Sequence, residues 1–171
     1  MPPIPQPENK FQYYAQRLLA LLAIAVIIPL FCSVNGCAIY RPGKPGSLEG
    51  YRRTVMTMEV TGYDSGPRSC NWTRNWRGQP VVASGPNRGK PKVVGLTASG
   101  KQARHGTIAA DTNYYPFGTV MYIPGYGYGT VEDRGGDIKG PHRLDLWFPS
   151  EREALRWGRQ KNVTVTIWKK Q

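Results

Sequence analysis

Glycine and proline punctuate this chain so densely that they restrict what it can fold into. Of its 171 residues, 20 are glycine and 15 are proline. Both mark turns, because glycine tolerates positive φ and proline lacks a backbone N–H. This composition favours short strands joined by tight turns over a helical bundle. The length leaves room for one compact domain with extensions.

The first 36 residues predict an export signal of the lipoprotein type. Lys10 and Arg17 precede an apolar run at residues 18–31, which is short for a bilayer span but fits the core of a signal peptide. Gly36 then stands directly before Cys37, as in the cleavage box of bacterial lipoproteins. Cys37 is therefore the candidate for lipidation and for anchoring to the membrane. A buried helix or an uncleaved anchor remain the alternatives.

Residues 37–52 are rich in Pro, Gly and Ser and predict a linker, so the folded domain is expected at 53–171. Removal of the signal would leave Cys70 as the one thiol besides Cys37. Neither a disulfide framework nor a metal cluster can be built from that, and we expect no metal or cofactor.

The net charge of +12 predicts an anionic partner. Nucleic acid, anionic lipid head groups and acidic wall polymers all fit the charge, but an exported chain without a recognition motif argues against nucleic acid. Residues 66–92 hold six cations and no acid, with Trp72 and Trp76 among them. A loop this long is usually functional or disordered. The tryptophans could line a groove for an anionic polymer or form a small satellite core.

Alternating and turn-bounded stretches predict five strands and one helix. Pro124-Gly125 predicts a turn with positive φ at the glycine, and Ser150 with Glu153 predicts a capping box for a helix at 151–159. Many short strands with one helix indicate a small, mainly β barrel. The predicted strands are 55–60, 119–123, 128–132, 143–148 and 163–167.

The strand at 143–148 places a carboxylate where one is unusual. Leu144, Leu146 and Phe148 share the core face, so Asp145 lies on the polar face. Aspartate is depleted in strands, and its presence there requires a reason. The reason could be catalysis, or an ion pair with Arg143 or Lys139.

Five of the 11 acidic residues fall between Asp111 and Asp145. An Asx turn would explain Asp111 alone, and a turn cap beside Gly135-Gly136 would explain Asp133 alone. Neither explains the clustering in a basic chain.

The ordered motifs resemble the three-aspartate domain family, which includes the membrane-bound lytic transglycosylases of murein, and the match runs from about Val55 to Trp168. The stretches that carry the resemblance are 58–63, 95–100, 106–111, 116–129, 132–136, 138–140, 143–146 and 153–158. The resemblance implies a double-psi β-barrel that cleaves the β-1,4 bond between N-acetylmuramic acid and N-acetylglucosamine in peptidoglycan.

The resemblance identifies Asp111, Asp133 and Asp145 as the named aspartates, with Asp145 as the catalytic acid. The family usually has alanine where this chain has Asp137, and commonly threonine where it has Arg134. Substrate contacts are expected from Tyr63, Trp72, Trp76, Thr97, Lys139 and Arg143.

A lytic transglycosylase needs one carboxyl, because the 6-hydroxyl of the sugar is the nucleophile and a 1,6-anhydro ring is the product. Asp145 would have to hold a proton well above its usual pKa of ~3.9. Asp111 and Asp133, if close, would raise that pKa, and Arg143 and Lys139 would lower it. Two other functions stay open: a non-catalytic wall-binding module, or a hydrolase that uses Asp111 and Asp145 as a carboxylate pair.

Overall fold

The computed structural model describes residues 46–170. The predicted signal at 1–36, the lipidation of Cys37 and most of the predicted linker lie outside these residues. Within residues 46–170, neither helix has the length and apolar character that a membrane crossing requires.

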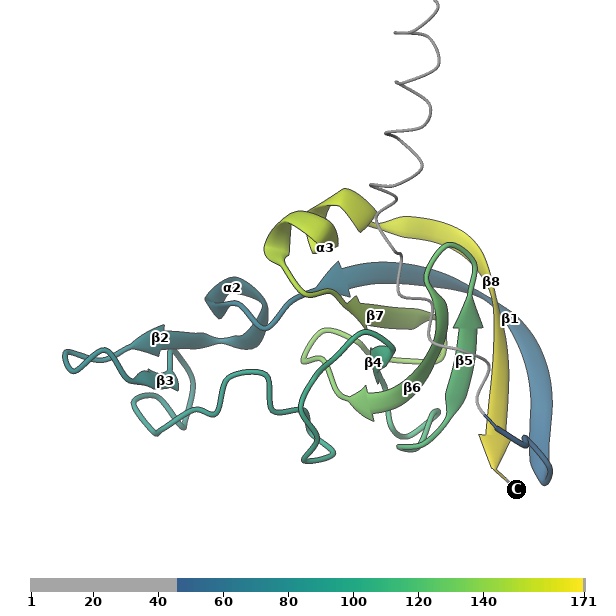
Figure 1. Cartoon of the computed structure of the whole chain (residues 1–171), viewed down its shortest axis with the longest axis horizontal. Helices are drawn as coiled ribbons and strands as arrows, with labels where there is room; N and C mark the ends of the chain where they lie inside the picture. The colour runs from purple at the N-terminus through teal and green to yellow at the C-terminus, as the bar shows by residue number, and fades with distance from the viewer. Residues whose placement is uncertain (1–45, 171) are drawn as a thin grey trace, which may run out of the picture. The chain divides into compact units, whose positions relative to one another are not determined.

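Six strands close into a barrel in the order β1-β7-β4-β6-β5-β8 (Figure 1). Two of its pairings, β1 with β7 and β4 with β6, are parallel, and the rest are antiparallel. A short helix, α3 (Glu151–Trp157), precedes the last strand. The prediction of a small, mainly β barrel of the double-psi class is confirmed. The barrel strands are β1 (Tyr51–Tyr63), β4 (Thr107–Ala110), β5 (Val120–Ile123), β6 (Gly127–Asp133), β7 (Arg143–Trp147) and β8 (Gln160–Lys170).

Strands β1 and β8 are longer than the alternation predicts and curve side by side over the barrel (Figure 1). The N-terminal part of β1 pairs with β8, and its C-terminal part from Glu59 pairs with β7. The register shifts between Met58 and Val60, where β1 passes from one partner to the other. β1 therefore connects two regions of the barrel wall.

The predicted inward faces are buried. Leu144 and Leu146 of β7 are 1% and 0% exposed, and Val165 and Ile167 of β8 are equally enclosed. Strand β4 shows no alternation of apolar and polar residues, and all four of its residues are buried. A central strand covered on both faces shows no period of two, and β4 was not predicted as a strand for that reason.

Local turn chemistry follows the sequence closely. Gly125 has φ +82, and the Tyr126 N–H donates to the Ile123 carbonyl across the predicted turn. Ser150 Oγ accepts from the Glu153 N–H at 3.3 Å and caps α3. The helix ends at Trp157 rather than at the expected Arg159, because Gly158 adopts positive φ.

The long basic excursion is more ordered than its sequence predicts. It begins with a four-residue helix, α2 (Pro67–Cys70). Strands β2 (Trp72–Arg74) and β3 (Pro80–Val82) then pair as an antiparallel hairpin separate from the barrel. Strands of three residues are too short to produce a readable period, which is why only a loop was predicted. We call residues 66–92 the basic hairpin segment.

Candidate functional site

Asp145 lies in the middle of β7, half-buried, and faces Thr61 of the neighbouring strand β1. The two residues are direct register partners in the parallel pair. Thr61 Oγ1 donates to Asp145 Oδ1 at 2.9 Å and also lies 3.3 Å from the Leu144 carbonyl oxygen. The Thr61 hydroxyl therefore fixes the orientation of the carboxyl.

The pKa of the Asp145 carboxyl is raised to about 6. Burial is the main cause, because it disfavours the ionised form, and the charge of Asp133 adds to it. Hydrogen bonds from Thr61 and from the Leu146 backbone, together with the charge of Arg143, oppose the rise. A carboxyl with this pKa exchanges its proton near neutral pH.

Asp133 ends β6 and is held by three donors. Tyr63 Oη donates to its Oδ2 at 3.0 Å, while the N–H groups of Ala98 and Arg134 donate to its Oδ1 at 2.9 and 2.8 Å. Burial raises the pKa of the Tyr63 phenol far above its usual value, and Asp133 raises it further. Tyr63 is thus a permanent donor, and the three donors fix the position of the Asp133 side chain.

The loop that supplies the Ala98 N–H is tied down by a buried carboxylate. Glu132 is 2% exposed and binds Lys101 Nζ at 2.9 Å and Arg104 Nη2 at 3.0 Å. Thr97 was expected to contact substrate, but its buried hydroxyl donates to the Lys101 carbonyl at 2.9 Å. In this arrangement Thr97 shapes the turn that presents Ala98 to Asp133.

Asp111 follows the end of β4, two residues after Ala109, which is the register partner of both Asp133 and Asp145. Its carboxylate accepts from the Gly140 N–H at 2.9 Å and from the Asn113 N–H at 3.1 Å. These bonds, that of Gly140 first, lower the pKa of Asp111. Asp111 and Lys139 line a small hollow of about 160 Å³, and neither Asp133 nor Asp145 belongs to its lining.

Arg143 is directed away from Asp145 and toward other partners. Its guanidinium donates to the Asp137 carbonyl at 2.9 Å and lies 3.5 Å from Glu59, which also binds Arg159. In the described part of the chain, no cation lies within ion-pair distance of Asp145. A structural ion pair with Arg143 or Lys139 therefore does not account for the carboxyl.

The basic hairpin segment adjoins the aspartates through Ser65. Trp72 Nε1 donates to the Ser65 carbonyl and Trp147 Nε1 donates to its hydroxyl, both at 2.9 Å. Burial raises the pKa of the Cys70 thiol to about 11, and Asp133 is the next largest cause, so α2 lies within the electrostatic reach of that aspartate.

The two tryptophans of the segment differ in their surroundings. Trp72 is half-buried, whereas Trp76 is 86% exposed and carries the Arg77 guanidinium at 4.4 Å from its ring centroid. Trp76 is therefore not part of a satellite core. An exposed indole beside cations is suited to contact with a polymer that passes over the surface.

Sequence reasoning missed Thr61, Ser65 and Glu132 as parts of this site. Thr61 occurs within the strand motif at 58–63, but only the β1–β7 register brings it to Asp145. The burial of Glu132 could not be anticipated, because charged residues are rarely buried unless paired.

As a whole the arrangement holds one carboxyl with a raised pKa, Asp145, under the electrostatic influence of a second carboxyl, Asp133. No group of three or more His, Cys, Asp or Glu side chains in residues 46–170 could hold a metal ion. The chemistry that these residues support is transfer of a proton to and from an oxygen atom.

Comparison with known proteins gives a family match over the C-terminal part of the barrel. The model of the 3D domain matches residues 106–169. The chain is 39% identical over 79 residues to the cell wall-binding protein YocH of Bacillus subtilis (strain 168), which is 44% of this chain and 27% of that protein. It is also 39% identical over 77 residues to the putative cell wall shaping protein YabE of the same organism, covering 43% of this chain and 18% of that protein.

This chain thus spans about a quarter or less of the length of these relatives. Among solved structures, the crystal structure of MltA from E. coli matches with a TM-score of 0.37 and 22% identity, over 48% of this chain and 30% of that one.

Proposed function

We propose that the protein is a peptidoglycan lytic transglycosylase of the cell envelope, and the match of residues 106–169 to the model of the 3D domain supports this proposal. Its substrate is the glycan strand, cut between N-acetylmuramic acid and N-acetylglucosamine with formation of 1,6-anhydro ends. Its location is outside the cytoplasm, with a membrane anchor at the N-terminus.

The observation that carries the proposal is the raised pKa of Asp145, about 6, in a carboxyl that no cation neutralises within residues 46–170. Roughly one such carboxyl in ten is protonated at pH 7, and the deprotonated form is still a competent base. A single residue can then serve both halves of a transglycosylation.

In the first step the protonated Asp145 donates its proton to the glycosidic oxygen as the bond from that oxygen to C1 of the muramic acid breaks. In the second step the 6-hydroxyl of the same sugar attacks C1 and returns its proton to the Asp145 carboxylate. The anhydro ring closes, and the carboxyl ends in its starting state. No water enters the product.

The neighbours of Asp145 have supporting roles in this proposal. Asp133 raises its pKa and places negative charge near the cationic character that develops at C1. Thr61 orients the carboxyl. Asp111 and Lys139 both line the small hollow, and in this proposal they contact another part of the glycan.

The second candidate is a wall-binding module without catalytic activity. Two observations favour this function. One relative, YocH, is named as a cell wall-binding protein. In this chain the exposed Trp76 carries the Arg77 guanidinium over its ring. A two-carboxylate hydrolase has less support, because two backbone N–H groups hold the Asp111 carboxylate and lower its pKa.

Digestion of purified sacculi separates the three functions. Mass spectrometry of the released fragments is expected to show 1,6-anhydro ends. Reducing ends would identify a hydrolase instead, and sedimentation of the protein with sacculi without any release would identify a binding module.

A further inference from the structure

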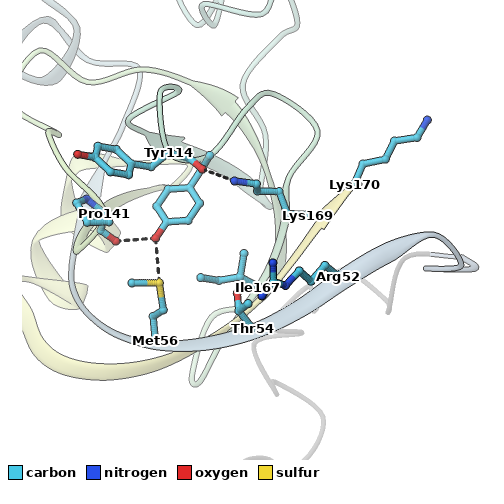
Figure 2. A pocket seen from close by; sticks show the side chains of 9 residues that line it. Arg52, Thr54, Met56, Tyr114, Pro141, Ile167, Lys169 and Lys170 are labelled. Carbon is cyan, nitrogen blue, oxygen red and sulfur yellow. Dashed lines mark hydrogen bonds between the residues drawn. The ribbon is translucent and has the colours of Figure 1, made fainter.

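A second hollow of the barrel lies away from Asp145, although two of its lining residues, Tyr114 and Tyr115, donate their N–H groups to the Asp111 carbonyl. It has a volume of about 490 Å³ and opens between the start of β1 and the end of β8 (Figure 2). Thr54 lines this hollow, whereas Thr61 lies seven residues further along the same strand. At ~3.3 Å a residue, the two places are roughly 20 Å apart along β1.

The rim of this hollow is basic, and one of its cations, Lys169, donates from Nζ to the Tyr114 carbonyl at 3.2 Å. Arg52 and Lys169 are direct partners across the antiparallel β1–β8 pair, and Lys170 lies beside them. Like charges in such positions destabilise a sheet. Among residues 46–170 no acidic side chain lines the hollow, and none of the three cations forms an ion pair. The rim therefore attracts an anion that the described chain does not supply.

The floor of the hollow is apolar. Ile167 is 1% exposed, and Tyr115 is 5% exposed with its hydroxyl donating to the Pro141 carbonyl at 2.7 Å. That hydroxyl also lies 3.3 Å from Met56 Sδ, and Figure 2 shows both contacts. The floor thus offers contact with hydrocarbon rather than with sugar hydroxyls. A phosphate alone is also far too small for a hollow in the size range of sites for drug-sized ligands.

An anionic group on an apolar body satisfies the rim and the floor together. We propose that this hollow binds the head group and first acyl carbons of an anionic phospholipid and so holds the barrel against a membrane surface. The site is independent of the proposed cleavage of glycan.

The position of the hollow in the chain favours a membrane lipid as its occupant. Arg52 lies at the start of the described strands, and 20 residues separate it from the apolar run at 18–31. If residues 18–31 enter a bilayer, as their sequence predicts, only 20 residues of chain connect the rim to that membrane.

The test uses the full chain in a neutral maltoside detergent, titrated with dihexanoylphosphatidylglycerol and followed by backbone NMR shifts at Arg52 and Lys169. Dihexanoylphosphatidylcholine and glycerol 3-phosphate serve as probes that lack the net charge or the acyl chains. Arg52→Gln/Lys169→Gln removes the facing cations, and Arg88→Gln/Lys161→Gln is the control with equal charge loss elsewhere. Thr54→Trp fills the hollow without changing charge, and Thr57→Trp is its control on the opposite face of β1.

We expect saturable binding of the phosphatidylglycerol probe, weakened roughly 10- to 30-fold by Arg52→Gln/Lys169→Gln and by about the same factor or more by Thr54→Trp, with both controls unchanged. Equal binding of glycerol 3-phosphate would overturn the lipid assignment in favour of a phosphate-bearing wall polymer. If Arg88→Gln/Lys161→Gln weakened binding of the phosphatidylglycerol probe equally, the loss would come from the lower net charge, and the proposed site would be wrong. Absence of saturable binding would overturn the proposal outright, while release of anhydro fragments from sacculi would still test the proposed function separately.

Discussion

The Asp145 carboxyl owes its properties to a balance between opposing neighbours. Burial and Asp133 raise its pKa, while Thr61, the Leu146 backbone and Arg143 lower it. The sequence predicted that Asp145 lies on the polar face of β7 and that the charges of Asp133 and Arg143 shift its pKa. The role of Thr61 could not be predicted, because Thr61 precedes Asp145 by 84 residues in the sequence and becomes its neighbour only through the β1–β7 register.

Removal of the Thr61 hydroxyl is expected to shift the pH profile. Thr61→Val deletes a hydrogen bond that favours the ionised carboxyl, so the pKa of Asp145 rises further above 6. The general acid then stays protonated to higher pH, and the alkaline limb of kcat/KM for anhydro-product release moves upward. Thr57→Val, at an exposed position on the same strand, is the control. An unmoved alkaline limb would exclude Asp145 as the titrating acid.

Glu132 is expected to contribute acid-sensitive stability. Burial raises its pKa, but the bonds from Lys101 and Arg104 outweigh this and leave the pKa below the usual value of about 4.3. The ionised form therefore stabilises the fold above that usual value, and the contribution is lost as pH falls through the folded-state pKa.

Glu132→Gln should lower the free energy of unfolding by about 1–3 kcal/mol at pH 7, with the lower part favoured because both cations are more than half exposed. Urea unfolding at pH 7 and at pH 3.5 measures the free energy of unfolding of the wild type and of the variant. The difference between wild type and variant should shrink at the lower pH, and a constant difference would contradict the assigned ion pairs.

At the scale of elements, β1 serves both the barrel and the site. Gly62 stands between Thr61 and Tyr63, and a Cβ there would lie 2.9 Å from Phe148 Cε2 and 3.1 Å from the Ala154 carbonyl oxygen. The absence of a side chain lets α3 and the end of β7 pack closely on β1.

Gly62→Ala should lower the free energy of unfolding by about 1–3 kcal/mol through overpacking. Thermal unfolding measures the loss, and Gly136→Ala is the control because a Cβ there meets nothing within 4 Å. Equal melting temperatures for the two variants would show that Phe148 and α3 can move aside at little cost.

The elements differ in how far their sequences reveal them. Strands with one buried face, such as β7, show alternation and were predicted with the correct inward residues. β4 is buried throughout and β2 and β3 have three residues each, so none of them shows a period. The aspartates were found by motif, but the sequence does not specify the registers that place Ala109 of β4 beside both Asp133 and Asp145.

At the scale of the whole molecule, the basic hairpin segment is expected to supply affinity for the wall rather than chemistry. Neutralising Arg74, Arg77 and Arg88 should weaken binding to sacculi and flatten its salt dependence, because salt screens exposed charges over ~10 Å at 0.1 M. Neutralising Arg152, Arg156 and Lys161, which are exposed on α3 and β8, removes equal charge as a control. Turnover of short soluble glycan fragments should change little. Complete loss of that turnover would assign the segment to the active site.

The central claim is that Asp145 transfers the proton in glycan cleavage, and its most direct test is the release of 1,6-anhydro fragments by Asp145→Asn. The amide keeps the shape of the carboxyl but cannot give and take a proton. The account predicts that the release rate measured by mass spectrometry falls by ~10²–10⁴-fold, while the melting temperature and the binding to sacculi stay close to those of the wild type. Near-normal release of anhydro fragments by a folded Asp145→Asn protein would contradict the account.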